Sequence, residues 1–140
     1  MRQKSSQKSN KSSGTKFEHE FAVLLAQHGF WAHVLEPKRN GSQPFDIMAV
    51  KNGIAYAFDC KVCENDFFTI NRIAENQHLA FEKWSKCGNG RAFIALKFAG
   101  EIFIALYSDI ITGKKKKGCE DVLNCGGMGV DEWISSLADK

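Results

Sequence analysis

One short stretch of the sequence, Phe58 to Asn65, reads FDCKVCEN and places an acid and a base two residues apart. Asp59 offers carboxylate oxygens, which are good ligands for Mg²⁺, and Lys61 offers an ammonium group that can neutralise a phosphate. Together they could hydrolyse a phosphodiester bond. Two other interpretations compete: a redox motif of the form Cys-x-x-Cys at Cys60 and Cys63, or the polar face of an ordinary strand.

A predicted hairpin brings a second aspartate to the first. Asn52-Gly53 stands between the apolar runs FDIMAV and IAYAFDCKV, and Asn-Gly in this position is the strongest short-range hairpin signal. A two-residue turn there would make Asp46 face Asp59, with Cβ atoms about 4.5–5.5 Å apart. Like charges placed this way destabilise a sheet unless something compensates, and a divalent cation is the usual compensation.

Alternation along the second strand of this hairpin decides which side chains share a face. Asp59 and Lys61 point to the same side, whereas Cys60 falls among the large apolar residues of the other side. Lys61 could therefore orient an attacking water or stabilise the transition state. The competing interpretation is that Asp46 caps the start of its strand and Asp59 forms a surface ion pair with Lys61.

Two predicted helices could complete the site. Gln77 lies within the apolar stripe of a helix expected from about Thr69 to Lys86, where a buried amide needs hydrogen-bond partners. Glu18 lies at the edge of the buried stripe of a helix expected from about Lys16 to His28. Spacing leaves two roles open for Glu18, because Thr15-x-x-Glu18 also fits a capping box.

The cysteines favour a reducing compartment. Their number is five, which is odd, and they are scattered along the chain, so we expect free thiols and no structural disulfide. A redox pair at Cys60 and Cys63 would need a helix N-terminus, whereas strand alternation points the two sulfurs to opposite faces.

The order of the predicted elements indicates an α/β protein. A helix, three strands, a second long helix and two strands follow one another, which implies a mixed β-sheet flanked by helices (α-β-β-β-α-β-β). Residues 1–15 are predicted to be a disordered basic arm and residues 16–140 a single domain, with a Lys-rich loop near 113–118 and a short helix near 131–139. No apolar run is long enough to cross a bilayer and the first residues lack the apolar segment of a secretory signal, so we expect a soluble, cytoplasmic protein.

The positive charge is small in total but clustered. The formal net charge is +3, with basic runs in the first residues and near residue 115. Such runs make a polyanionic partner plausible. The residues predicted to contact the phosphates of such a partner are Lys16, Lys38, Arg39, Ser42, Lys114 and Lys115.

Together these features resemble the PD-(D/E)XK nuclease superfamily, and within it the Holliday junction resolvases of the archaeal Hjc and bacterial RecU types. The resemblance runs from about Gly14 to Tyr107 and is carried by FEHEF, NGSQPFDIMAV, AYAFDCKV and ENQHLAFEKW. The positions that match the functional residues of these families are Glu18, Ser42, Asp46, Asp59, Lys61 and Gln77.

This resemblance implies a restriction-endonuclease-like core and an Mg²⁺-dependent endonuclease, with Mn²⁺ able to substitute, that acts as a homodimer and nicks opposing strands of a four-way DNA junction. It implies that Glu18, Asp46, Asp59 and the backbone carbonyl near Cys60 hold the metal. Lys61 would be the catalytic base or charge stabiliser, with Gln77 supporting the site. The alternatives are a restriction-type or repair nuclease acting on branched or duplex DNA with the same core, and a DNA-binding module without catalysis.

Overall fold

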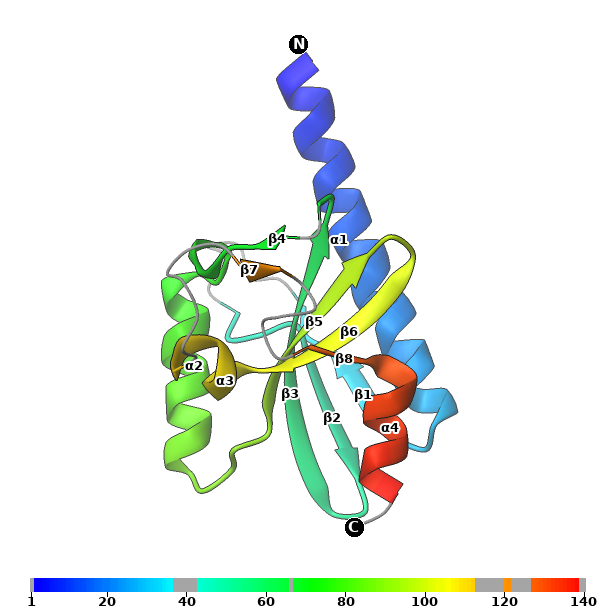
Figure 1. Cartoon of the computed structure of the whole chain (residues 1–140), viewed down its shortest axis with the longest axis vertical. Helices are drawn as coiled ribbons and strands as arrows, with labels where there is room; N and C mark the ends of the chain where they lie inside the picture. The colour runs from blue at the N-terminus through cyan, green and yellow to red at the C-terminus, as the bar shows by residue number, and fades with distance from the viewer. Residues whose placement is uncertain (1, 37–42, 66, 113–119, 122–126, 139–140) are drawn as a thin grey trace.

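A six-stranded sheet forms the centre of the computed structural model, which describes residues 2–36, 43–65, 67–112, 120–121 and 127–138. The strand order is β1-β2-β3-β5-β6-β8 (Figure 1). The strands are β1 (Trp31–Val34), β2 (Ile47–Lys51), β3 (Ile54–Cys63), β5 (Ala92–Phe98), β6 (Glu101–Leu106) and β8 (Met128–Gly129). Strands β3 and β5 run parallel and the other neighbours run antiparallel, so the prediction of a mixed sheet is confirmed.

Helices cover both faces of this sheet. They are α1 (Arg2–Gln27), α2 (Glu75–Lys86), α3 (Tyr107–Thr112) and α4 (Val130–Ala138). Phe21 of α1 and Trp133 of α4 belong to the core on one face, whereas Phe81 of α2 and Tyr107 of α3 belong to the core on the other face. Within the described ranges, no helix combines the length and apolar content that crossing a bilayer requires.

The apolar stripe of α1 fixes this helix on the sheet. Phe17, Phe21 and Leu25 recur at helical spacing and are almost fully buried. Phe21 meets the ring of Phe58 edge to face, with 5.1 Å between ring centroids. Burying a side chain of this size stabilises the fold by about 1.5–3 kcal/mol relative to leaving it exposed. The face of α1 next to this stripe is thereby held against β3.

The hairpin between β2 and β3 forms in the predicted register, except at its end. Asn52 and Gly53 have φ of 54° and 76°, as a type I′ turn requires, and Val50 pairs with Ala55. The pairing stops at Ile47 and Phe58, so the predicted direct pair of Asp46 with Asp59 is not formed. The Asp46 N–H donates instead to the Phe58 carbonyl at 3.0 Å, so Asp46 and Ile47 both oppose Phe58, as in a β-bulge.

Helix α1 is longer than the sequence pattern predicts. Residues 2–15, expected to be a disordered arm, continue this helix, which begins at Arg2. Six of these fourteen residues are Arg, Lys or Gln, which are good helix formers, five are Ser, which is intermediate, and the segment contains no proline. Extending a helix that tertiary contacts already hold costs much less than starting a new one. Thr15 therefore lies inside α1, and the predicted capping box at the helix start is wrong.

Other element boundaries depart from the periodicity in smaller ways. Helix α2 begins at Glu75 rather than near Thr69, because Ile73 and Ala74 have extended backbone and separate it from a 3₁₀ turn, Ile70–Arg72. The sequence analysis missed α3, β8 and a small second sheet of β4 (Phe67–Phe68) and β7 (Glu120–Asp121). Strands of two residues are too short to show alternation. Helix α4 lies where the C-terminal helix was predicted.

Candidate active site

Asp59 stands at the centre of the candidate site, on β3. Its side chain is completely buried, and it is the only charged side chain among the largest fully buried residues of the described chain. Gln77 Nε2 donates a 2.7 Å hydrogen bond to Asp59 Oδ1, and Lys61 Nζ lies 3.2 Å from Oδ2. This ammonium is not aligned for a hydrogen bond, so Oδ2 has no hydrogen-bond donor in the described structure. One oxygen of Asp59 is therefore still free to accept a ligand.

Asp46 lies beside Asp59 at the end of the hairpin. Its Oδ2 accepts a 2.7 Å hydrogen bond from the Cys60 N–H and thus takes the place of a strand partner. Contacts with α2 hold the segment that precedes Asp46 in the chain. Phe45 stacks on Phe81, with 5.9 Å between ring centroids, and meets Trp84 edge to face.

Helix α2 makes a further contact with this segment. Asn76 Nδ2 donates to the Gln43 carbonyl at 2.8 Å, while the next residue, Gln77, holds Asp59. Gln77 Oε1 also accepts the Ala74 N–H at 3.1 Å and lies 3.4 Å from Lys61 Nζ. The first turn of α2 therefore positions both aspartates. Gln77 was predicted from its place in an apolar stripe, but Asn76 and Phe45 were not, because a partly buried polar residue on a helix and an apolar residue before a strand carry no distinctive pattern.

Glu18 reaches the same site from α1. Its side chain is half-buried, and its pKa is raised to about 7, first by burial and then by the charge of Asp46 and a hydrogen bond with it. The positive charge of Lys61 acts in the opposite direction. Glu18 lies inside α1 and caps no helix, so the capping role is wrong, whereas its role as a metal ligand stays a prediction.

Burial and the neighbouring acids also raise the pKa of Asp59 well above its usual range. Burial is the largest cause, followed by the close approach of the Asp46 carboxyl group, and the charge of Lys61 opposes the rise. Asp46 thus contacts both other carboxyl groups. Three such groups in contact cannot all ionise without a positive charge among them, and the single ammonium of Lys61 leaves two negative charges uncompensated.

This donor set fits a hard divalent cation, since carboxylate oxygens are the preferred ligands of Mg²⁺ and suit Mn²⁺ as well. Among the residues the structure describes, no three His, Cys, Asp or Glu side chains are already spaced as a coordination shell. The acids contact one another instead, so a cation would have to draw Glu18, Asp46 and Asp59 apart around itself. The Asp59 oxygen that lacks a donor is the ligand that such a cation would meet first.

The cysteines of FDCKVCEN do not form a redox pair. Cys60 is a free thiol in the core beneath α1, and Cys63 is a free thiol in the core on the other face. Burial raises the pKa of both thiols. Since its thiol lies in the core beneath α1, Cys60 could contribute to a metal site at the acids only through its backbone, and that role stays a prediction.

Most of the predicted DNA contacts cannot be placed. Lys16 is exposed on α1, close in sequence to Glu18. The other predicted positions lie outside the described residues, namely Lys38, Arg39, Ser42, Lys114 and Lys115.

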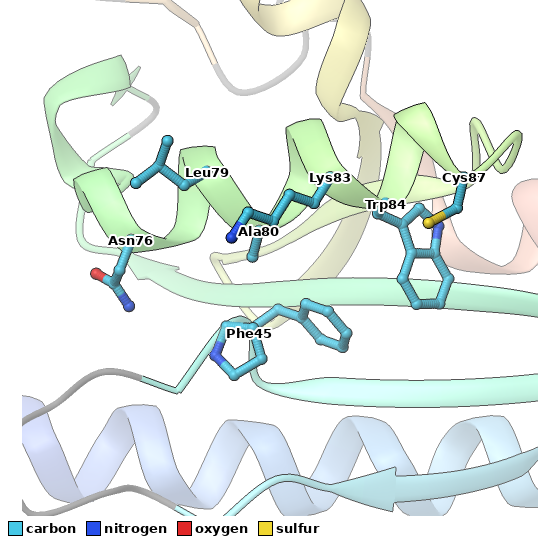
Figure 2. Close-up of a pocket in the computed structure, with 8 residues that line it drawn as sticks. Phe45, Asn76, Leu79, Ala80, Lys83, Trp84 and Cys87 are labelled. Carbon is cyan, nitrogen blue, oxygen red and sulfur yellow. The ribbon is translucent and has the colours of Figure 1, made fainter.

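An apolar pocket of about 490 Å³ lies next to this site but is separate from it. Figure 2 shows Phe45 below α2, with Ala80 and Trp84 projecting from the helix towards it. None of Glu18, Asp46, Asp59 or Lys61 lines this pocket. The pocket and the acidic cluster are therefore two separate features that share the segment at Phe45.

Comparison with known proteins agrees with the family resemblance seen in the sequence. The model of the archaeal Holliday junction resolvase (Hjc) family matches residues 9–121. The crossover junction endodeoxyribonuclease Hjc of Methanocaldococcus jannaschii is 30% identical over 89 residues, which cover 64% of this chain and 62% of that protein. The chain thus matches less than two thirds of the length of this curated relative.

A solved structure shows that the fold is shared. Hjc of Archaeoglobus fulgidus, described as a Holliday junction resolvase from an archaeal hyperthermophile, superposes with a TM-score of 0.66 at 20% sequence identity. The match covers 86% of this chain and 99% of that one. The predicted restriction-endonuclease-like core is therefore confirmed.

Proposed function

Because this chain belongs to the archaeal Holliday junction resolvase family, whose model spans most of it, we propose that it is a metal-dependent endonuclease that resolves four-way DNA junctions by paired nicks. The observation that carries the proposal is the contact of Glu18, Asp46 and Asp59 beside Lys61. Such a cluster lowers the stability of the fold, and binding a cation and a phosphodiester would compensate for that cost. We assign the reaction to one domain, residues 16–140.

The three acids would hold the cation, Mg²⁺ or in its place Mn²⁺, together with the backbone carbonyl of Cys60. When bound, the cation would activate the attacking water and neutralise charge that develops on the scissile phosphate. The burial of Asp59 keeps bulk water away from the cation side of the site. Gln77 donates to one oxygen of Asp59, so the other oxygen, which has no hydrogen-bond partner, would be available to hold the cation.

Lys61 is suited to act on the substrate. Its side chain is 17% exposed, so the ammonium can reach both solvent and the buried acids. Asp59 Oδ2 and Gln77 Oε1 orient it from two sides at 3.2 Å and 3.4 Å. In this place it can hold the water for attack on phosphorus or donate to a phosphate oxygen as the bond to the leaving oxygen breaks.

Resolution of a junction requires cuts in two strands, so we propose that the active form is a homodimer with two-fold symmetry. Each protomer would then present one cluster to one of the two strands. The mass of the protein in solution, free and bound to a junction, tests this part separately. A monomer on the junction that still makes paired nicks would contradict it.

A cleavage assay tests the main proposal. The intact protein is incubated with a labelled four-way junction and with linear duplex of the same sequence, each with Mg²⁺, with Mn²⁺ or with EDTA. We expect symmetric nicks in the junction only, and only with a cation. Cleavage of linear duplex at an equal rate would indicate a restriction-type or repair nuclease. Cation-independent binding without cleavage would indicate a DNA-binding module.

A further inference from the structure

The edge of β3 that faces β2 is open beyond Phe58. Pairing with β2 stops at Phe58, whereas pairing with β5 on the other edge continues to Cys63. The Ala57 N–H points towards β5, where it donates to the Arg91 carbonyl, and the Phe58 carbonyl points towards β2, where it accepts the Asp46 N–H. Because backbone groups alternate along a strand, those of Cys60 and Val62 also face the open edge.

Two side chains form hydrogen bonds with the backbone groups of this open edge. Asp46 Oδ2 accepts the Cys60 N–H at 2.7 Å, and Arg72 Nη2 donates to the Val62 carbonyl at 2.9 Å. Cys60 and Val62 are about 6.6 Å apart along the strand, at ~3.3 Å per residue. Arg72 is therefore fixed one step further along the same edge from the acid that would hold the cation.

The guanidinium of Arg72 has capacity for a further ligand. Of its five N–H groups, one donates to the Val62 carbonyl and another lies near Cys63 Sγ, with 3.7 Å between Nη1 and sulfur. The residue is exposed, and no carboxylate in the described parts of the chain lies within ion-pair distance of it. Because the hydrogen bond to β3 already restricts the Arg72 side chain, binding a ligand would cost less side-chain entropy.

We infer that Arg72 binds a backbone phosphate of the strand that is cut, next to the phosphate attacked at Asp46, Asp59 and Lys61. A positive, forked donor held beside a carboxylate cluster matches a polyanion whose neighbouring phosphate lies at that cluster. The inference rests on the proposed function for the identity of the polyanion. The competing role is purely structural, in which Arg72 only satisfies the Val62 carbonyl.

The salt dependence of DNA binding separates the two roles. Binding of the intact protein to a labelled four-way junction is measured in EDTA at several salt concentrations for wild type, Arg72→Gln and Arg91→Gln. Glutamine keeps an N–H donor for the Val62 carbonyl and removes the charge. Arg91 is a matched control, because it is also exposed and directly precedes β5, where its carbonyl accepts the Ala57 N–H on the edge of β3 opposite to the open one.

We expect the slope of log K against log salt to become shallower by about 0.9 for Arg72→Gln and to stay unchanged for Arg91→Gln. Arg72→Lys should keep the slope but bind several-fold more weakly, because a point charge replaces the fork. An unchanged slope for Arg72→Gln, or equal changes in both Gln variants, overturns the inference. If Arg72→Gln does not fold, Arg72→Lys decides alone, and wild-type affinity in that variant overturns it.

The same samples, given Mg²⁺, separate this inference from the proposed function. If wild type cleaves the junction but Arg72→Gln binds DNA with the wild-type salt dependence, the phosphate contact is refuted and the proposed nuclease function is supported. If wild type does not cleave but Arg72→Gln binds DNA with a shallower salt dependence, the nuclease function is refuted and the phosphate contact is supported.

Discussion

Asp59 combines two properties that stability alone would not favour: it is completely buried, and it contacts another acid. Burying a charge costs several kcal/mol, and one nearby ammonium seldom offsets that cost. The burial raises the pKa of Asp59, so protons compete with a cation for this carboxylate. The proposed role in holding a cation therefore explains the position of Asp59 better than a role in stability does.

Replacing Asp59 should separate function from stability. Asp59→Asn keeps the shape and an acceptor for Gln77, and its new amide can donate to Asp46, but it removes the negative charge. We expect no junction cleavage, DNA binding close to wild type, and a melting temperature equal to or above that of wild type. Asp109→Asn, at an exposed position on α3, is the control and should cleave normally. Cleavage by Asp59→Asn would remove Asp59 from the mechanism, and a large fall in melting temperature would contradict the argument about burial.

Glu18 makes the stability of the metal-free protein depend on pH. Its pKa is about 7 in the folded protein against 4.5 for an ordinary glutamate, so between these values the folded state binds a proton that the unfolded state has lost. The free energy of unfolding therefore falls as pH rises through this window and, as far as Glu18 is concerned, levels off above pH 7.

Urea unfolding in EDTA across this pH range checks the sign. Wild type should lose stability as pH rises, and Glu18→Gln should lose less, because glutamine does not titrate. Glu82→Gln, at an exposed position on α2, should follow wild type. Parallel curves for wild type and Glu18→Gln would show that Glu18 titrates normally. Added Mg²⁺ should stabilise wild type more at high pH, where the carboxylates are ionised.

At the scale of elements, α2 organises the site. Gln77 holds Asp59 on β3, Asn76 holds the Gln43 carbonyl, and Phe45 stacks beneath the helix at Phe81. Helix α1 brings Glu18 to the other side of the acids. The cluster therefore depends on two helices that lie on opposite faces of one sheet.

Truncating the amide that joins α2 to β3 should weaken both the fold and the reaction. Gln77→Ala leaves Asp59 Oδ1 buried without its donor and frees the Ala74 N–H, at a cost of about 1–3 kcal/mol in the free energy of unfolding. Loss of a residue that orients a metal ligand typically lowers activity about 10–100-fold. Ser85→Ala, at an exposed position on the same helix, is the control, and it should unfold and cleave the junction as wild type does. Normal cleavage by Gln77→Ala would restrict Gln77 to a structural role.

The sequence predicts those parts of the site that follow from local rules. Asn52-Gly53 fixes the hairpin register, and alternation separates Cys60 from Asp59 and Lys61, because both depend only on neighbours in the chain. The contact of Asp46 with Cys60 could not be predicted, since a bulge changes the register by packing rather than by pattern. Arg72 was missed for a similar reason, because the break at Ile73 interrupts the helical period.

At the scale of the whole molecule, the acidic cluster and the N-terminal turns of α1 lie towards the same end (Figure 1). The hairpin turn of β2 and β3 and the loop from α2 to β5 lie at one end, whereas the carboxyl end of β3 and the N-terminal turns of α1 lie at the other (Figure 1). Asp59 and Lys61 belong to the second end. The basic residues at the start of the chain therefore lie on the side from which DNA would approach the site.

This arrangement predicts that positive charge at the N-terminal end of α1 contributes more to DNA binding than the net charge of the protein does. Changing Lys4, Lys8 and Lys11 together to Gln lowers the formal net charge from +3 to 0 (3 − 3 = 0), and glutamine preserves helix propensity. The control changes Lys83, Lys86 and Arg91 to Gln, which removes the same charge from the far end (Figure 1). We expect the first variant to bind a four-way junction more weakly, with a shallower salt dependence, and the control to stay close to wild type. Equal losses in the two variants would show that DNA senses only the total charge, and the direction of approach inferred from the fold would then be wrong.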